Sequence, residues 1–210
     1  MDIFGFIATV VLLTASGALA PGPLFFATIS HGARSGVKSG LIFSLSHTVV
    51  EFALIMVLAF GLFTVVHESF VRNVIGLCGG VVLLIFGGYQ TYSSIIKKTG
   101  NTQEPASSHR LFVKGLLFTG LNPYFILWWF TVGSTLILMA LELAGFLGVI
   151  FMFLCHIWMD YVWLGSVAYC AQRGVNAIGS TWYRVIIGAF GIILICFGFV
   201  FIRDVLIANI

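Results

Sequence analysis

Residues 16–26 read Ser-Gly-Ala-Leu-Ala-Pro-Gly-Pro-Leu-Phe-Phe, and the triplet Pro21-Gly22-Pro23 interrupts a long apolar stretch. Proline lacks a backbone N–H and clashes with the carbonyl one helical turn earlier, so this triplet breaks a helix. A second break follows at Asn122-Pro123, again within an apolar stretch. In hydrocarbon, freed backbone groups need partners, so such breaks are tolerated inside protein or beside a water-filled cavity. Both breaks therefore predict interrupted helices that face the protein interior or a water-filled cavity.

The composition around these breaks is that of a membrane protein. The chain has 210 residues, of which 60% are hydrophobic and 8% charged, whereas soluble domains carry about 25% charged residues. Six apolar stretches are each long enough to cross a hydrocarbon core of about 30 Å. We expect an all-α membrane protein with one transmembrane domain over residues 1–210 and a polar linker at 97–110. The expected helices span residues 3–30, 38–66, 72–96, 111–139, 142–171 and 182–207.

The positive charges gather at alternate connections between these helices. Eight of the ten basic residues fall at the connections between helices 1 and 2, 3 and 4, and 5 and 6. The positive-inside rule therefore predicts a multi-pass protein of the cytoplasmic membrane, with those connections in the cytoplasm and both termini outside. The net charge of +3 follows from this bias, and we expect no nucleic-acid partner. The eight residues are Arg34, Lys38, Lys97, Lys98, Arg110, Lys114, Arg173 and Arg184.

The two halves of the chain repeat the same features in the same order. A histidine precedes an acid by four residues in each half, at His47 and Glu51 and at His156 and Asp160. Each pair follows a proline break, and each is followed by a glycine-rich helix. With three helices per half, the second half enters the membrane from the opposite side. The sequence therefore predicts a 3+3 inverted repeat of residues 1–96 and 111–210, an arrangement typical of secondary transporters.

The glycines of the third and sixth expected helices indicate close helix packing, because lipid provides no hydrophobic drive for helix association. We expect these two helices to act as scaffold or dimer-contact helices. The residues are Gly76, Gly79, Gly80, Gly87 and Gly88 in the first half and Gly188, Gly191 and Gly198 in the second.

The ionisable pairs are the candidate chemical centre. Residues four apart share one face of a helix, and an ionised carboxylate inside a membrane is expensive unless it faces the protein interior. Three interpretations remain open for His47, Glu51, His156 and Asp160. They form a proton relay or substrate-ammonium site, they lock helix packing as satisfied polar contacts, or they meet across a pseudo-twofold axis and bind a divalent metal ion.

The helix breaks are the candidate substrate site. The unpaired amides of a half-helix favour an anion such as a carboxylate, while the freed carbonyls favour an ammonium group, and an amino acid carries both. Simple kinks are the alternative, and both breaks also lie toward the cytoplasmic ends of their helices, where they would form a cytoplasmic mouth. The expected substrate-binding residues are Pro21, Gly22, Pro23, Asn122, Pro123 and Tyr124.

The tryptophans mostly indicate anchors at the membrane–water interface, although Trp128 and Trp129 follow Pro123 closely enough to line a cavity. The other tryptophans are Trp158, Trp163 and Trp182. The HExxH, GxSxG and Walker patterns are absent from the sequence, so we expect neither an enzyme nor a cofactor.

Several of these motifs together resemble the lysine-exporter (LysE/RhtB-type) translocators. They are Pro21-Gly22-Pro23 at the first break, the basic turn Gly36-x3-Gly40 with Arg34 and Lys38, and Gly120-Leu121-Asn122-Pro123 opening the second half. The resemblance implies a six-helix inner-membrane exporter of amino acids or related small solutes, often dimeric and driven by protons. The family often has lysine after Asn-Pro, where this chain has Tyr124. The second hypothesis is a divalent-cation exporter of the wider superfamily, with the two His–acid pairs as ligands.

Overall fold

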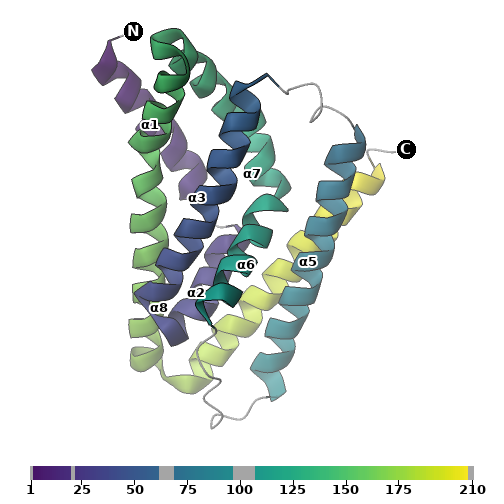
Figure 1. Cartoon of the computed structure of the whole chain (residues 1–210). Helices are drawn as coiled ribbons and strands as arrows, with labels where there is room; N and C mark the ends of the chain where they lie inside the picture. The colour runs from purple at the N-terminus through teal and green to yellow at the C-terminus, as the bar shows by residue number, and fades with distance from the viewer. Residues whose placement is uncertain (1, 20–21, 62–68, 97–106, 208–210) are drawn as a thin grey trace.

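The chain folds into a bundle of helices, described here by a computed structural model for residues 2–19, 22–61, 69–96 and 107–207 (Figure 1). All regular secondary structure in these ranges is helical, which confirms the all-α prediction. Two described stretches have the length and apolarity to cross a membrane, Val37–Ala59 and Tyr124–Gly174, and Ile3–Ala15 is a shorter apolar helix. The arrangement of six helices as a 3+3 repeat stays a prediction.

The first half starts with a capped helix and turns sharply at a glycine. The Asp2 carboxylate accepts a hydrogen bond from the Gly5 N–H at 3.1 Å and so caps α1. Gly36 has a φ of +58°, a conformation that suits glycine, and separates α2 from α3. The elements of this half are α1 (Ile3–Ala18), α2 (Pro23–Ser35), α3 (Val37–Ala59) and α5 (Ser69–Ile96).

In the second half, residues Ser134–Ile207 form one long helical run, α8, that changes direction twice. Gly145 has a φ of +57°, and Figure 1 shows α8 reversing in this region and again further along, where its colour turns yellow-green. The residues of the two expected connections, 140–141 and 172–181, are helical and form no loop. The elements are α6 (Ser108–Gly120), α7 (Pro123–Trp128), the π-helix η1 (Trp129–Gly133) and α8 (Ser134–Ile207).

Helices end and restart at both sequence breaks. Helix α1 ends at Ala18, and α2 begins with Pro23 in its first turn after Gly22 in an extended conformation. Pro21 lies outside the described residues. Helix α6 ends at Gly120 and α7 begins at Pro123, where the Asn122 side chain accepts a hydrogen bond from the Tyr124 N–H at 3.1 Å. Proline in the first turn costs no intrahelical hydrogen bond, so each proline starts a new helix.

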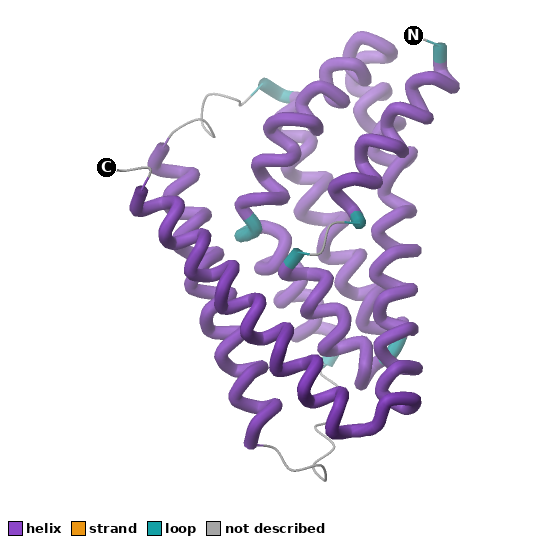
Figure 2. The backbone as a smooth tube through the Cα atoms, turned by 180° about the vertical axis from the view of Figure 1, so that it is seen from behind, coloured by secondary structure: helices purple, strands orange, loops and turns teal. Residues whose placement is uncertain are grey.

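Helix α5 packs against the last part of α8 through pairs of glycines, and the two form an inclined pair in Figures 1 and 2. A Cβ on Gly80 would lie 2.9 Å from the Gly198 carbonyl oxygen, and a Cβ on Gly87 would lie 2.6 Å from that of Gly191. These contacts leave no space for side chains, which confirms the predicted close approach. Gly88 instead faces open space.

Three helices meet at a second close contact, which we call the Ala168 junction. A Cβ on Gly32 of α2 would lie 2.6 Å from the Ala168 Cα in α8, and a Cβ on Gly40 of α3 would lie 3.0 Å from the Ala168 Cβ. The Gly40 position also abuts the backbone carbonyl of Leu164. Glycine at both positions therefore lets α2 and α3 pack directly on the backbone of α8.

The apolar interior has two clusters of buried side chains. One cluster includes Phe6, Ile55 and Trp129, and the other includes Phe43, Leu111 and Leu164. Cavity-lining side chains belong to both clusters, since Trp129 is part of the first and Leu164 of the second. The polar site described below therefore lies between two regions of packed apolar core.

Candidate functional site

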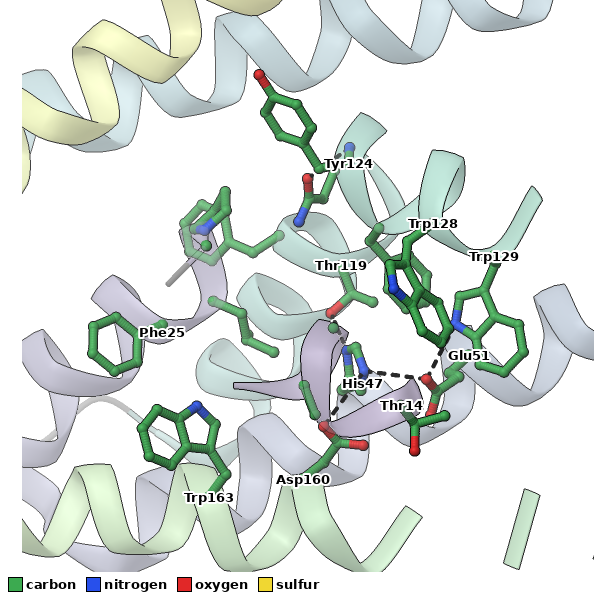
Figure 3. Close-up of a pocket in the computed structure, with 18 of the residues that line it drawn as sticks. Thr14, Phe25, His47, Glu51, Thr119, Tyr124, Trp128, Trp129, Asp160 and Trp163 are labelled. Carbon is green, nitrogen blue, oxygen red and sulfur yellow. Dashed lines mark hydrogen bonds and ion pairs between the residues drawn. The ribbon is translucent and has the colours of Figure 1, made fainter. Parts of the chain in front are cut away.

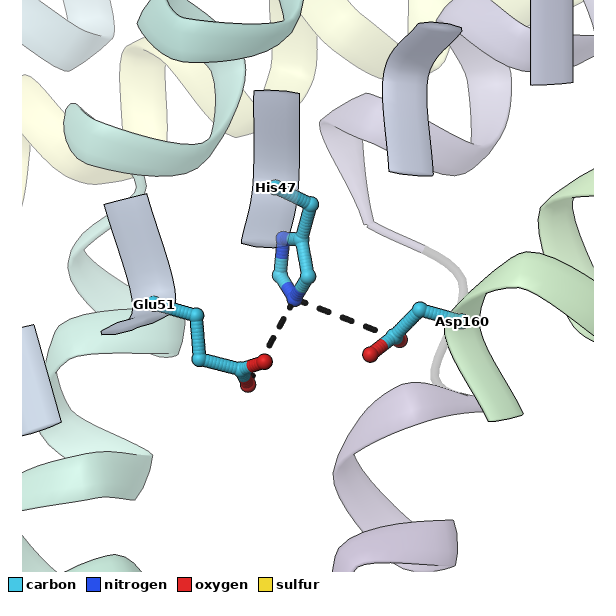
Figure 4. Close-up of side chains that lie close together, drawn as sticks. All are labelled: His47, Glu51 and Asp160. Carbon is cyan, nitrogen blue, oxygen red and sulfur yellow. Dashed lines mark ion pairs between the residues drawn. The ribbon is translucent and has the colours of Figure 1, made fainter. Parts of the chain in front are cut away.

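The two His–acid pairs, 105 residues or more apart in sequence, come together between α3 and α8. His47 Nε2 lies 3.6 Å from Glu51 Oε1 on its own helix and 4.0 Å from Asp160 Oδ1 on α8. His156 Nε2 lies 3.4 Å from Glu51 Oε2. Figure 4 shows the His47 ring pointing between the two carboxylates. The spacing of four residues places each histidine and its acid on one helical face, and the packing of α3 on α8 brings the two faces together.

The carboxylates of this cluster are almost fully buried. Glu51 is 4% exposed and Asp160 is 5% exposed. Trp129, itself buried, donates its indole Nε1–H to Glu51 Oε1 at 3.2 Å. Burying a charge is costly unless it is paired and hydrogen-bonded. Here the indole hydrogen-bonds Glu51, and the imidazoles lie 3.4–4.0 Å from the carboxylates, where they form ion pairs when protonated.

The His156–Glu51 contact requires a proton. The Met152 carbonyl accepts a hydrogen bond from His156 Nδ1 at 3.1 Å, so Nδ1 carries a hydrogen. In the neutral imidazole Nε2 then presents a lone pair toward Glu51 Oε2, and two acceptors would face each other. The contact becomes favourable when a proton resides on either Nε2 or Oε2. Both atoms are buried and have no other hydrogen-bond partner among the described residues.

Other polar groups hold the remaining members in place. His47 Nδ1 is hydrogen-bonded to Thr119 Oγ1 of α6 at 3.2 Å, which fixes the orientation of the ring. The Ser44 hydroxyl of α3 donates to the main-chain carbonyl of Asp160 at 3.0 Å. The cluster is therefore supported by α6 as well as by the two helices that carry it.

A cavity of about 640 Å³ joins the ionisable cluster to both helix breaks (Figure 3). All four ionisable residues line it. From the breaks, the lining includes Gly22, Pro23, Asn122 and Tyr124. Pro123 begins α7 and is not among the described residues that line the cavity. The structure thus brings four residues of the predicted substrate site and the predicted relay into a single space.

Three tryptophans line the same cavity, which confirms the cavity alternative for Trp128 and Trp129 and places Trp163, expected to be an interfacial anchor, there as well. Trp128, Trp129 and Trp163 all face the cavity, and Trp129 is only 1% exposed. Trp158 is half-exposed, and the Trp182 side chain lies outside the described residues. Trp163 follows Asp160 by three residues, and this helical spacing was the available signal for its position. Trp128 and Trp129 were expected at a cavity from their position after Pro123, whereas the π-helix that contains Trp129 cannot be read from the sequence.

Part of the cluster has the geometry of a metal site. The ligand atoms of His47, Glu51 and Asp160 lie within 4.8 Å of one another. His156 does not belong to this group among the described residues. The metal alternative therefore retains three of its four expected ligands.

Comparison with known proteins identifies the family for most of the chain. A family model described as LysE type translocator matches residues 15–205. Comparisons with curated proteins and with solved structures gave no match. The matched range contains both helix breaks, the ionisable cluster and nearly all of the cavity wall. The chain therefore belongs to the LysE type translocator family.

Proposed function

We propose that the protein is a secondary transporter that exports amino acids or related small solutes across the cytoplasmic membrane, in exchange for protons. Membership of a translocator family supports membrane transport. The observation that carries the proposal is the single cavity shared by the helix breaks and the buried carboxylates Glu51 and Asp160. A buried ionisable group that faces a cavity in a membrane protein marks a substrate or proton pathway.

In this proposal the carboxylates bind the ammonium group of the substrate. Glu51 and Asp160 lie on opposite sides of His47, whose Nε2 is 3.6 Å and 4.0 Å from them. An imidazolium and a substrate ammonium compete for this position, because both are cations seeking the same two carboxylates. Backbone groups near Gly22 and Asn122 bind the other polar end of the substrate.

Proton exchange uses the same cluster. The His156–Glu51 contact at 3.4 Å is favourable only when it holds a proton. When a cationic substrate binds at Glu51, its charge neutralises the carboxylate in place of the proton, and the proton is released. Alternating occupancy by proton and substrate gives antiport, in which the proton gradient drives export.

The inverted repeat and its topology are part of the proposal. The two breaks lie against each other, since a Cβ on Gly22 would be 3.7 Å from Asn122 Nδ2. The connection between α2 and α3 and the start of α6 lie toward the lower end in Figure 1, while α1 begins and α8 ends toward the top. We propose that the lower end faces the cytoplasm, that both termini lie outside, and that the protein can form a homodimer.

Transport in proteoliposomes under an imposed pH gradient tests this function. A labelled amino-acid panel is compared in the wild type, in the Glu51→Gln/Asp160→Asn double variant and in Glu142→Gln. Glu142 is an exposed acid on α8 outside the cavity lining and serves as the matched control. We expect pH-driven movement of an amino acid that is lost in the double variant and kept in the control. Unchanged pH-driven transport in the double variant would refute the proposed coupling.

Divalent cations form the second arm of the same experiment. His47, Glu51 and Asp160 are close enough to contact one ion, so a metal substrate gives a distinct result. Movement of a divalent cation with no amino-acid signal, together with metal-dependent stabilisation lost in His47→Ala, would replace amino-acid export by metal export.

A further inference from the structure

The cavity has no fixed positive charge to match its carboxylates. Among the described residues that line it, none is lysine or arginine, and the ionisable ones are Glu51, Asp160 and two histidines. With both imidazoles protonated and both carboxylates ionised, the four side chains sum to zero. With either imidazole neutral and both carboxylates ionised, the four side chains carry a net negative charge. In no state with both carboxylates ionised is the net charge of these side chains positive, so a substrate carboxylate gains no net attraction from them, and a substrate cation is favoured once an imidazole loses its proton.

Aromatic rings stand on both sides of the carboxylates. Phe25 and Trp163 stack with their centroids 5.9 Å apart and an interplanar angle of 14°. Trp128 and Trp129 pack edge to face at 5.2 Å on the opposite side (Figure 3). The faces of aromatic rings attract cations and also contact apolar groups. Carboxylates between aromatic rings match an organic cation with an apolar body.

One wall carries a neutral donor without a partner. The Trp163 indole Nε1 is buried and has no hydrogen-bond partner among the described residues. A buried donor without an acceptor is costly, and a bound ligand that offers an oxygen would satisfy it. The donor is uncharged, so a carbonyl or hydroxyl oxygen serves as well as a carboxylate.

From these three observations we propose that the cavity selects organic ammonium compounds with an apolar or aromatic body, and that a free carboxylate on the substrate is not required. The inference rests on the proposed function, because it narrows the substrate class of the same cavity. The amino group binds at Glu51 and Asp160, the apolar body lies against the aromatic rings, and Trp163 hydrogen-bonds a neutral or charged acceptor. The cavity volume of about 640 Å³ is within the range of small-molecule sites.

Four compounds that share a benzyl group separate the contributions of charge. They are phenylalanine, its methyl ester, 2-phenylethylamine and 3-phenylpropionate, tested for thermal stabilisation of the purified wild-type protein. We expect the ester and the amine to stabilise the protein at concentrations equal to or lower than phenylalanine, and phenylpropionate to have no effect. Stabilisation by phenylalanine without stabilisation by the amine or the ester would overturn the inference, as would stabilisation by phenylpropionate or by none of the four.

A variant at Trp163 tests the acceptor position. Trp163→Phe keeps a ring against Phe25 and removes the donor, so apparent affinity for the ester should fall about 3- to 10-fold, as for one lost hydrogen bond. Affinity for 2-phenylethylamine, which has no acceptor oxygen, should be unchanged. The half-exposed Trp158, changed to Phe, is the matched control. Equal losses for both ligands in Trp163→Phe would contradict the assigned role.

The inference and the proposed function fail in different ways. Ligand stabilisation in the expected order with no transport of any compound would leave the inference standing and overturn the proposed function. Proton-driven transport of amino acids, with no binding of the amine or the ester, would overturn the inference alone.

Discussion

The indole Nε1 of Trp129 donates a hydrogen bond to Glu51 Oε1 at 3.2 Å, and both side chains are buried. This bond connects the π-helix η1 to α3, two elements from different halves of the chain. The π-turn adds one residue to a helical turn, and such turns frequently occur at functional sites. Through this bond, the local irregularity after the second helix break controls the position of a carboxylate on α3.

Removing the Trp129 donor should weaken both stability and transport. Trp129→Phe keeps an aromatic ring and leaves one buried Glu51 oxygen without its donor, so we expect a loss of about 1–3 kcal/mol in the free energy of unfolding. Thermal unfolding in detergent and transport in proteoliposomes measure the two effects. The control is Trp158→Phe, because its Nε1 donates to the Cys155 carbonyl on an exposed face. Equal behaviour of the two variants would refute the importance of the Trp129 bond.

A methyl group at Gly40 should separate α3 from α8. The added Cβ would collide with the backbone carbonyl of Leu164, which cannot move aside as a flexible side chain could. We expect Gly40→Ala to lower the free energy of unfolding by about 1–3 kcal/mol through overpacking. Gly88→Ala is the comparison, since its Cβ would meet nothing within 4 Å. The prediction fails if chemical denaturation gives the same stability for both variants.

The Asn122 cap should matter through its side-chain oxygen. Asn122→Ala removes the acceptor for the Tyr124 N–H and should cost about 1 kcal/mol, as for other helix N-caps. Asn122→Asp keeps an acceptor at this position and should retain most of the stability. Ser107→Ala removes the exposed cap of α6 and provides a reference cap outside the cavity. An Asp variant as unstable as the Ala variant would show that the amide acts in another way.

His47 should be energetically coupled to Asp160 across the two helices. His47→Ala leaves two buried carboxylates without the imidazole between them, and Asp160→Asn removes one of the charges that the imidazole faces at 4.0 Å. A double-mutant cycle of thermal stability should therefore show a coupling energy of roughly 0.5–3 kcal/mol. The exposed His109, replaced by Ala and combined with Asp160→Asn, should give additive effects. Additivity for the His47 cycle as well would mean that the contact has no energetic role.

The sequence predicted the parts of the site that depend on local rules. Proline fixes where helices restart, so Pro23 and Asn122-Pro123 marked helix starts that the structure places at the cavity. The spacing of four residues put His47 with Glu51 on one face of a helix. Glycine on the third and sixth expected helices indicated close packing, and Gly80 with Gly198 show it.

Other parts of the site depend on tertiary packing and had no local signal. The contact of Trp129 with Glu51 requires both the π-turn and the packing of η1 on α3. The contacts of Thr119 with His47 and of Ser44 with the Asp160 carbonyl join residues 72 and 116 positions apart. The sequence predicted a reversal at 140–141, close to Gly145, but it did not predict that the helical run of α8 extends through this reversal.

The Ala168 junction also determines how the cluster can respond to motion. Ala168 lies eight residues beyond Asp160 on α8, about 12 Å along a helix. Because Gly32 and Gly40 pack closely against it, Ala168 is the point about which α8 would pivot. A tilt of α8 on α3 about this point would change the His47–Asp160 and His156–Glu51 distances together. The His47–Glu51 distance, within one helix, would stay the same. A change in the angle between α8 and α3 would therefore change the two His–acid contacts that hold protons between the helices.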